Sequence, residues 1–132
     1  YCSDLTRSFV IGKPDDQFKR IYNIVLQAQM DTERAMRAGL PGKEADAVAR
    51  RVIEEAGFAE NFGHGLGHGL GLAVHEKPSA GRLSDDTLME GGVVTVEPGI
   101  YIPGWGGVRI EDVVIIEQGR AQVMTQAHKP QY

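Results

Sequence analysis

Apolar residues in the first half of the chain recur with the three- and four-residue spacing of amphipathic helices. One stretch follows Pro14 and Asp15, a pair typical of a helix start because an acidic side chain caps the first free N–H groups, and it runs to Met36. A second stretch covers about residues 43–56, and Gly57 follows it in the position where helices commonly end. The pattern predicts two helices, each with an apolar side suited to covering a sheet.

The pattern changes at Gly63, where helical spacing gives way to the alternation of apolar and polar residues that is typical of strands. We expect strands at residues 69–75, 92–97, 108–117 and 121–125, with Gln118-Gly119 as the hairpin turn between the last two. The opening stretch, residues 1–12, also alternates and is expected to form a strand with one face made by Cys2, Asp4 and Thr6. Helices and strands in this arrangement predict an α+β fold with an antiparallel sheet.

Composition places the 132-residue chain among ordinary globular domains. Hydrophobic residues make up 42% and charged residues 24%, so neither a disordered tail nor a fibrous protein fits. The net charge is −4 and Lys and Arg form no cluster, which argues against a nucleic-acid partner. The longest strongly apolar run covers residues 113–116, far short of a membrane helix. The single cysteine, Cys2, cannot form an internal disulfide, so a cytoplasmic location is expected.

Glycine and histidine concentrate in one part of the chain, and this is the first sign of chemistry. Of 17 glycines, 12 lie between positions 63 and 107, and three of the four histidines, His64, His68 and His75, lie in the stretch 63–76. Glycines beside a histidine let backbone and imidazole approach a metal or a substrate without a Cβ clash. Leucine and valine residues alternate with them, so we interpret this stretch as a packed site rather than as a flexible loop.

Spacing excludes several common catalytic motifs. The segment His75-Glu76-Lys77-Pro78-Ser79 has serine where the helical zinc-peptidase motif needs its second histidine. The chain contains no glycine-rich phosphate loop before a helix and no nucleophile elbow. Cys2 has no accompanying catalytic signature and is expected to pack rather than to act as a nucleophile.

Two carboxylates occupy apolar stretches that are expected to be strands. Glu97 ends the run 93–96, and Glu111 shares a face with Arg109 and with two apolar residues expected to be buried, Val113 and Ile115. A charge in such a position is costly unless an opposite charge or a bound cation compensates it. The residues by themselves leave two interpretations open, an arginine–glutamate pair on a sheet surface or part of a cation site.

Taken together, these residues resemble the metal-dependent aminopeptidases of the pita-bread fold, specifically the Xaa-Pro branch that contains prolidase and aminopeptidase P. The resemblance spans nearly the whole chain and rests on four blocks in the family's order: Ser3-Asp4-Leu5-Thr6-Arg7, His64 to Pro78, Val96-Glu97-Pro98-Gly99-Ile100-Tyr101 and Arg109-Ile110-Glu111-Asp112. It implies an α+β pita-bread fold in which two main helices cover a curved antiparallel sheet.

The resemblance also implies a dinuclear metal centre. Asp4 and Glu111 match ligands that bridge two divalent ions, whereas His68 and Glu97 match ligands that bind one ion only. Carboxylates and one imidazole suit Mn²⁺, Co²⁺ or Zn²⁺.

The remaining roles follow from the same resemblance. His64 and His75 match positions that bind substrate and stabilise the tetrahedral intermediate, and Glu97 is expected to transfer the proton. Arg109 matches an arginine that orders the substrate and, in dipeptidases, binds its free carboxylate. The implied activity is hydrolysis of the bond before proline, in a dipeptide or a longer peptide, by an enzyme that is a homodimer when intact.

In that family the first metal ligand is an aspartate on a preceding strand, which would lie before Tyr1. We therefore expect residues 1–132 to be the C-terminal portion of a catalytic domain. This portion is expected to be inactive by itself and to hold at most one ion. A missing N-terminal segment or a separate chain would complete the catalytic domain. Two other functions stay open: a metal-free pita-bread binding module, and a creatinase-like hydrolase that uses the same scaffold without metal. Metal analysis distinguishes both from a two-metal peptidase.

Overall fold

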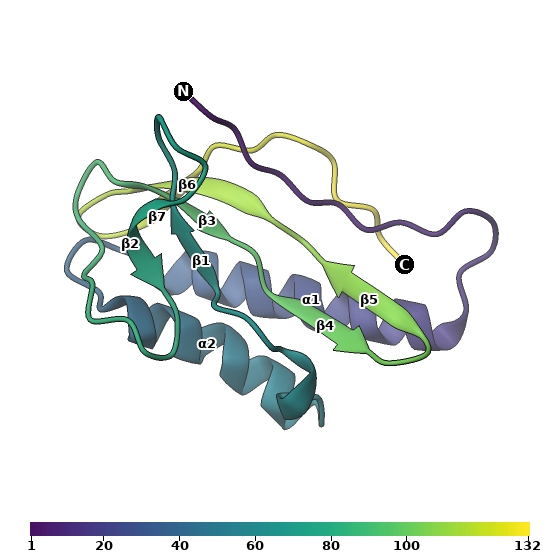
Figure 1. Ribbon diagram of the computed structural model, residues 1–132. Helices are drawn as coiled ribbons and strands as arrows, with labels where there is room; N and C mark the ends of the chain where they lie inside the picture. The colour runs from purple at the N-terminus through teal and green to yellow at the C-terminus, as the bar shows by residue number, and fades with distance from the viewer.

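Helices α1 (Asp16–Ala35) and α2 (Gly42–Glu55) pack against each other and cover one face of the sheet (Figure 1). The computed structural model describes all 132 residues. α1 begins where the side chain of Asp15 accepts a hydrogen bond of 2.7 Å from the backbone N–H of Phe18. It ends at Met36, whose backbone is extended. The first predicted helix is therefore confirmed together with its cap.

α2 ends in a Schellman motif. The N–H of Gly57 donates to the carbonyl of Glu54, and the N–H of Phe58 donates to the carbonyl of Ile53. Gly57 has a φ of 90°, which glycine adopts without the steric cost that a Cβ brings. The second predicted helix and its terminating glycine are confirmed, and a short 3₁₀ helix, η1 (Ala59–Asn61), follows.

The sheet has five strands in the order β2-β1-β3-β6-β7, and every neighbouring pair is antiparallel. The five strands are β1 (Gly67–Gly69), β2 (Glu76–Ala80), β3 (Val93–Val96), β6 (Asp112–Ile116) and β7 (Ala121–Val123). A separate antiparallel hairpin consists of β4 (Gly99–Ile102) and β5 (Gly106–Arg109). The α+β class is confirmed, and so is the turn at residues 118–119 between β6 and β7.

One hydrophobic core lies between the helices and the sheet. It contains 21 buried residues, among them Ile21 and Val25 of α1, Ile53 of α2, and Val94 and Val114 of the sheet. Removing this apolar surface from water is the main force that holds the helices on the sheet. No helix in the structure has the length and apolar character needed to cross a lipid bilayer.

Two predicted strands are wrong. Residues 1–12 run extended but contribute a single β-bridge, between Thr6 and Glu111, so they form a strap and not a strand. The predicted alternation does hold within the strap, because Cys2, Asp4 and Thr6 are half-buried whereas the residues between them are exposed. The strand expected at 69–75 is a loop over residues 70–75, because the ladder between β1 and β2 shifts register at Gly69 and resumes at Glu76.

The strand expected at 108–117 is also divided, into β5 and β6. The division falls at Ile110-Glu111, opposite Glu97-Pro98, and the sequence analysis missed β4 on the other side of it. Pro98 has no N–H to donate, so the ladder is interrupted here and only one long backbone bond of 3.5 Å, from the N–H of Ile110 to the carbonyl of Pro98, crosses the interruption. The expected burial of Val113 and Ile115 is wrong in part, because both are half-buried and the buried side of β6 is made by Asp112, Val114 and Ile116.

The C-terminal tail, residues 124–132, runs beside the N-terminal strap (Figure 1). Lys129 of the tail forms ion pairs with Asp112 of β6 and Glu33 of α1, at a place where both carboxylates are largely removed from water. Burial raises the pKa of Glu33 to about 7, and the neighbouring Asp112 adds to the rise although Lys129 opposes it.

This raised pKa predicts how stability depends on pH. The folded chain binds the Glu33 proton more tightly than the unfolded chain between about pH 4.5 and 7, so the contribution of this group to stability falls as the pH rises through that range. Glu33→Gln removes the titration, and the variant should gain stability relative to the wild type between pH 4.5 and pH 8. Urea unfolding at both pH values is the measurement, and the exposed Glu55→Gln is the control. Parallel pH profiles for wild type and Glu33→Gln would contradict this assignment.

Candidate metal centre

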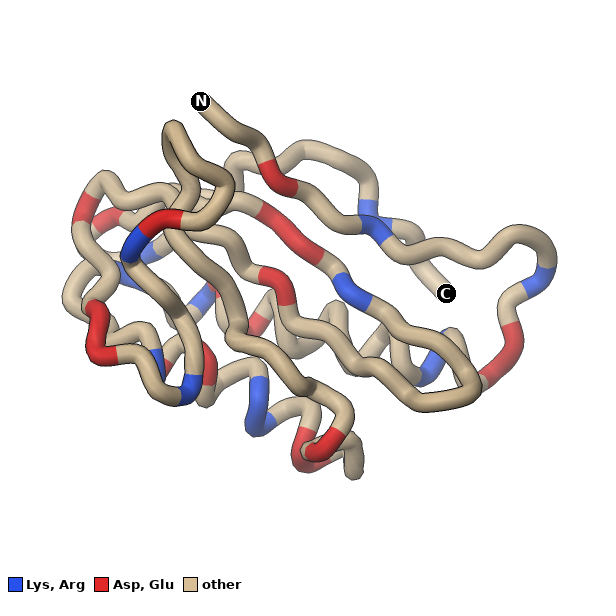
Figure 2. The backbone as a smooth tube through the Cα atoms, in the orientation of Figure 1, with Lys and Arg blue, Asp and Glu red and all other residues tan.

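Four predicted metal ligands converge from four parts of the chain. Asp4 lies on the N-terminal strap, His68 on β1, and Glu97 and Glu111 lie where the β3–β4 and β5–β6 segments are interrupted. One potential ligand atom from each of Asp4, His68 and Glu111 lies within 4.8 Å of the others. Figure 2 shows the acidic positions of these neighbouring segments side by side above the helices. The tertiary fold therefore brings together residues that are up to 107 positions apart.

The His68 imidazole is held in the tautomer that suits a metal ligand. Its Nδ1 lies 3.0 Å from the carbonyl of Gly69, an acceptor only, so Nδ1 carries the proton and Nε2 keeps its lone pair. Nε2 lies 3.2 Å from Oε1 of Glu97 and 3.7 Å from Oδ2 of Asp4. The free lone pair thus points toward two carboxylates.

The glycines on either side of His68 let neighbouring strands approach closely. A Cβ on Gly67 would lie 2.0 Å from the carbonyl oxygen of Thr95, and a Cβ on Gly69 would lie 2.1 Å from that of Lys77. Neither glycine has a positive φ, so close approach and not backbone conformation requires them. These two glycines therefore serve the packing of β1 between its neighbours, and the expected close approach of a metal or a substrate stays a prediction.

Two threonines orient the carboxylates, and the sequence analysis missed both. The buried Thr95 hydroxyl accepts a hydrogen bond from the backbone N–H of His68 and donates to Oε1 of Glu97, at 3.0 and 3.2 Å. The Thr6 hydroxyl donates to Oε2 of Glu111 at 2.5 Å. The sequence signal for this role was weak: Thr6 lies two positions from Asp4, and Thr95 lies two positions from Glu97.

Negative charge accumulates at the centre. Glu111 is only 2% exposed, and burial raises its pKa to about 6. The hydrogen bond from Thr6 acts against this shift, whereas the nearby carboxylates of Glu97 and Asp4 add to it. Arg109 is the cation nearest to them, with its Nε 3.9 Å from Oε2 of Glu97. Three carboxylates and an imidazole form a donor set that a divalent cation would satisfy. The residues present therefore fit the metal implied by the resemblance.

A chain of hydrogen bonds links the predicted substrate residues His64 and Arg109 through Tyr101. The Nη1 group of Arg109 donates to the Tyr101 hydroxyl at 3.2 Å, and that hydroxyl lies 2.7 Å from Nε2 of His64. Because Nδ1 of His64 lies 2.7 Å from the carbonyl of Gly65, Nδ1 is the protonated nitrogen and Nε2 accepts from Tyr101. The hydrogen bond to Tyr101 raises the pKa of Arg109. Tyr101 stood in a recognised block, but nothing in the sequence assigned it a role.

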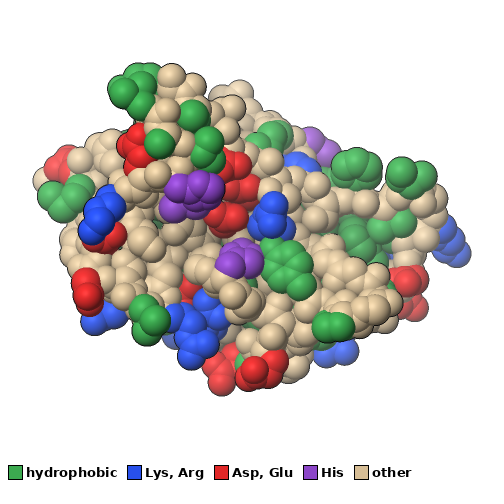
Figure 3. Space-filling view, in the orientation of Figure 1, with side chains coloured by type: hydrophobic (Ala, Val, Ile, Leu, Met, Phe, Trp, Pro, Cys, Tyr) green, Lys and Arg blue, Asp and Glu red, His purple; other side chains and the backbone are tan.

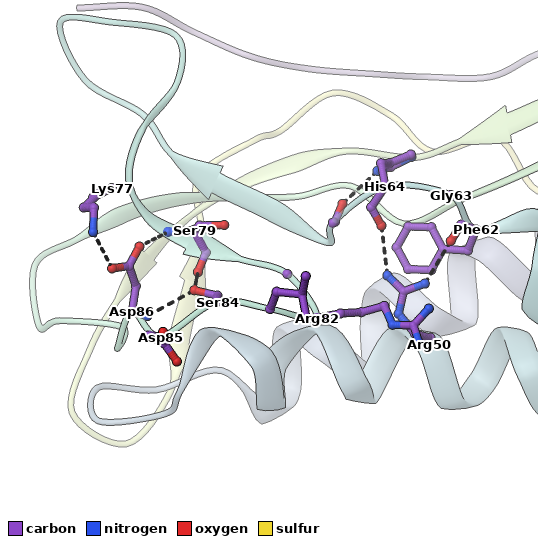
Figure 4. Close-up of a pocket in the computed structure, with 13 residues that line it drawn as sticks. Arg50, Phe62, Gly63, His64, Lys77, Ser79, Arg82, Ser84, Asp85 and Asp86 are labelled. Atoms are coloured by element: carbon purple, nitrogen blue, oxygen red, sulfur yellow. Dashed lines mark hydrogen bonds and ion pairs between the residues drawn. The ribbon is translucent and has the colours of Figure 1, made fainter.

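Helix α2 positions the loop that carries His64. Arg50 pairs with Asp46 through two hydrogen bonds, lies against the Phe62 ring, and donates to the carbonyls of Phe62 and His64 (Figure 4). Asp46 is buried and also accepts from the N–H of Leu66. The ion pair thus links α2 to the backbone on both sides of His64.

His75 differs from the other predicted residues because it is exposed. Its ring lies over that of His68, with 4.2 Å between centroids, on the loop between β1 and β2. Glu76 accepts from the N–H of Ala73 in this loop, and the N–H of Cys2 on the strap donates to Gly71. These two hydrogen bonds hold the loop in place, and they keep the His75 ring against that of His68.

A cleft of about 340 Å³ opens over the centre. It is lined by His64, Gly65, Gly67, His68, His75, Ser79, Glu97 and Arg109. Figure 3 shows histidine side chains on this face beside acidic and basic ones. A larger hollow of about 880 Å³ shares Ser79 and the His64 loop with it and continues toward α2 (Figure 4). Five of the seven predicted residues line the cleft, and the other two, Asp4 and Glu111, adjoin it through His68 and Thr6.

The close approach at Gly67 gives a direct test of the packing. Gly67→Ala should force β1 away from β3 and cost about 1–3 kcal/mol of stability or more, as overpacking does. Gly63→Ala is the matched control, because a Cβ there meets nothing within 4 Å. Urea unfolding followed by circular dichroism measures both variants. Equal stability of the two would show that β1 and β3 do not need this approach.

Comparison with known proteins agrees with the geometry. Residues 1–118 match the sequence pattern of metallopeptidase family M24. An Xaa-Pro dipeptidase of Pyrococcus horikoshii is 46% identical over 129 residues, which cover 98% of this chain and 37% of the relative. Among solved structures, an Xaa-Pro dipeptidase from Bacillus anthracis has a TM-score of 0.97 at 52% identity, over 99% of this chain and 37% of the other. An X-Pro aminopeptidase from Thermotoga maritima has a TM-score of 0.96 at 44% identity, over 100% and 37%.

The chain thus spans about 37% of the length of the relatives it matches. Over that span its two helices and antiparallel sheet reproduce the pita-bread arrangement of the prolidase structures, as the four sequence blocks implied. The chain belongs to metallopeptidase family M24.

Proposed function

We propose that the protein containing this chain is a two-metal exopeptidase that hydrolyses the peptide bond preceding proline, and that residues 1–132 are the C-terminal portion of its catalytic domain. The observation that carries the proposal is the position of His68 Nε2, which lies 3.2 Å from a carboxylate oxygen of Glu97 and 3.7 Å from one of Asp4. Relatives that cover 98–100% of the chain include proteins named Xaa-Pro dipeptidase and X-Pro aminopeptidase, which supports the same activity.

The ligands are proposed residue by residue. Asp4 and Glu111 would be shared between two divalent ions of Mn²⁺, Co²⁺ or Zn²⁺, whereas His68 and Glu97 would each hold one ion. When bound, such a pair of ions lowers the pKa of a water molecule and polarises the carbonyl of the substrate. Thr6 and Thr95 keep the carboxylates turned toward the centre by the hydrogen bonds described above.

The other residues act on the substrate. His75 is exposed above His68, so its ring N–H is free to donate to the oxygen that gains charge in the transition state. Glu97, at the floor of the cleft, accepts the proton of the attacking water and passes it to the leaving nitrogen. His64 lines the same cleft and contacts the substrate beside Tyr101.

Arg109 is the residue proposed to meet the free carboxylate of a dipeptide. Its Nε and Nη1 donate to Thr6 and Tyr101, which fixes the plane of the guanidinium. Nη2 makes no hydrogen bond within the chain, and the side chain is 40% exposed on the wall of the cleft. A guanidinium held in this way binds a carboxylate by parallel hydrogen bonds. This geometry favours a dipeptide substrate, with a longer proline-containing peptide as the alternative.

The metal centre argues against a metal-free binding module and against a creatinase-like hydrolase. Neither function needs Glu111 to be buried beside Asp4 and Glu97, where burial and these two carboxylates raise its pKa. A cytoplasmic location is proposed from the single cysteine of the chain. The homodimer implied by the resemblance stays a prediction.

The first test separates His68 from His75 in the intact protein. Loss of a ligand should leave His68→Ala deficient in metal after dialysis, because the imidazole supplies a bond to the ion. Loss of a transition-state donor should leave His75→Ala with its metal and lower kcat about 100- to 1,000-fold. The exposed His128→Ala is the control. Elemental analysis and kcat on an Xaa-Pro dipeptide are measured for each variant.

The reverse pattern, with metal lost in His75→Ala and kept in His68→Ala, would exchange the two roles. Full Xaa-Pro hydrolysis by wild type after complete removal of metal would overturn the proposed function and favour a creatinase-like enzyme. Wild type that neither binds metal nor cleaves the peptide would favour the binding module.

The second test concerns Arg109→Lys. A lysine cannot form two parallel hydrogen bonds with a carboxylate, so kcat/KM for a dipeptide should fall about 10- to 100-fold while metal affinity stays near that of wild type. The same dipeptide with an amidated C-terminus is the matched control, because it offers no carboxylate and should be much less sensitive to the substitution. Equal losses on both substrates would remove carboxylate recognition from Arg109.

A further inference from the structure

Every N–H group of the Arg7 guanidinium has an acceptor. A guanidinium carries five N–H donors. In this structure Nε donates to the carbonyl of His128 at 3.1 Å, and Nη2 donates to Oδ1 of Asp112 and to the carbonyl of Ala127 at 2.6 and 2.8 Å. Nη1 donates to the carbonyls of Thr6 and Glu111 at 2.9 and 2.7 Å. The side chain is also largely buried, at 12% exposure.

These bonds join the two backbone segments that carry the proposed bridging ligands. The strap carries Asp4, and one backbone–backbone bond of 3.0 Å, from the N–H of Glu111 to the carbonyl of Thr6, attaches it to the interrupted strand. The Ser8 hydroxyl adds a side-chain attachment, because it bonds to the N–H and the carbonyl of Arg109. Arg7 donates to that same Thr6 carbonyl and to the carbonyl of Glu111 through a single nitrogen. The guanidinium therefore fixes the spacing between the strap and the interrupted strand at the β-bridge of Thr6 and Glu111.

The remaining bonds hold the guanidinium itself. Asp112 follows Glu111 directly, points to the buried side of β6, and forms an ion pair with Arg7 while Lys129 pairs with its other oxygen. The carbonyls of Ala127 and His128, on the C-terminal tail, accept hydrogen bonds from the remaining guanidinium N–H groups. A lysine at position 7 would have three donors on a flexible stem and could not reach this set of acceptors in one plane.

We propose that Arg7 is a positioning residue that sets the separation of the Asp4 and Glu111 carboxylates and thereby the affinity of the metal centre. This inference rests on the proposed function, because it takes Asp4 and Glu111 as ligands. Arg7 touches neither carboxylate and acts through the backbone of Thr6 and Glu111. Outer partners of this kind contribute about 10- to 100-fold in metal affinity.

The test is a metal titration of the intact protein. Co²⁺ binding is followed by calorimetry and by its visible absorption, which reports ligand number and geometry, and unfolding is followed by circular dichroism. Arg7→Lys should remain folded, bind Co²⁺ about 10- to 100-fold more weakly, and show an altered Co²⁺ spectrum. Lys129→Met is the matched control, because it removes the other cation on Asp112 and leaves the guanidinium bonds in place. Its Co²⁺ affinity and spectrum should match those of wild type.

Three results would overturn the proposal. Arg7→Lys with wild-type affinity and spectrum would show that the guanidinium does not set the ligand spacing. Equal weakening by Lys129→Met would assign the effect to charge around Asp112. An Arg7→Lys variant that stays unfolded with and without Co²⁺, beside a folded Lys129→Met, would make Arg7 a residue of general stability. A wild-type protein that binds no Co²⁺ overturns the proposed function itself, so the two failures are distinguishable.

Discussion

The centre depends on one interruption of a β ladder. β3 and β6 pair up to Val96 and Asp112, and β4 and β5 pair from Gly99 and Arg109, but between them the ladder stops. Pro98 has no N–H to offer there. The free N–H of Glu97 donates to the carbonyl of Leu66, and that of Glu111 donates to Thr6. Backbone groups released from the ladder therefore attach the histidine strand and the N-terminal strap, and each attachment brings a ligand to the same point.

The electrostatics follow from this geometry. Carboxylates that leave the ladder turn to the side of the sheet away from the helical core, where Asp4 meets them beneath the strap. Burial and the nearby carboxylates of Glu97 and Asp4 raise the pKa of Glu111, because water cannot fully solvate the charge of its carboxylate. Hydroxyl groups of Thr6 and Thr95 stabilise single oxygens, and a divalent cation would satisfy the rest.

Arginines support the residues of the centre at three places. Arg50 holds the carbonyls around His64, Arg109 holds the hydroxyl of Tyr101, and Arg7 holds the carbonyls beside the lone bridge. Planar guanidinium groups with several fixed donors suit this work, because one side chain can hold several acceptors at once. The positive charges also offset the carboxylates without entering the ligand set.

The sequence by itself determined the local features of this protein. The Asp15 cap, the apolar stripes of both helices and the glycine at position 57 act over a few residues, so their pattern predicted α1 and α2. Four ordered blocks carried the family resemblance, and that resemblance proposed Asp4, His68, Glu97 and Glu111 as ligands, all of residue types that bind divalent metals. Only the tertiary structure decided that residues 1–12 form a strap, that the 108–117 stretch divides, and that Thr95 and Tyr101 support the site. These outcomes depend on pairing between distant segments, and a backbone N–H takes whichever acceptor the fold places opposite it.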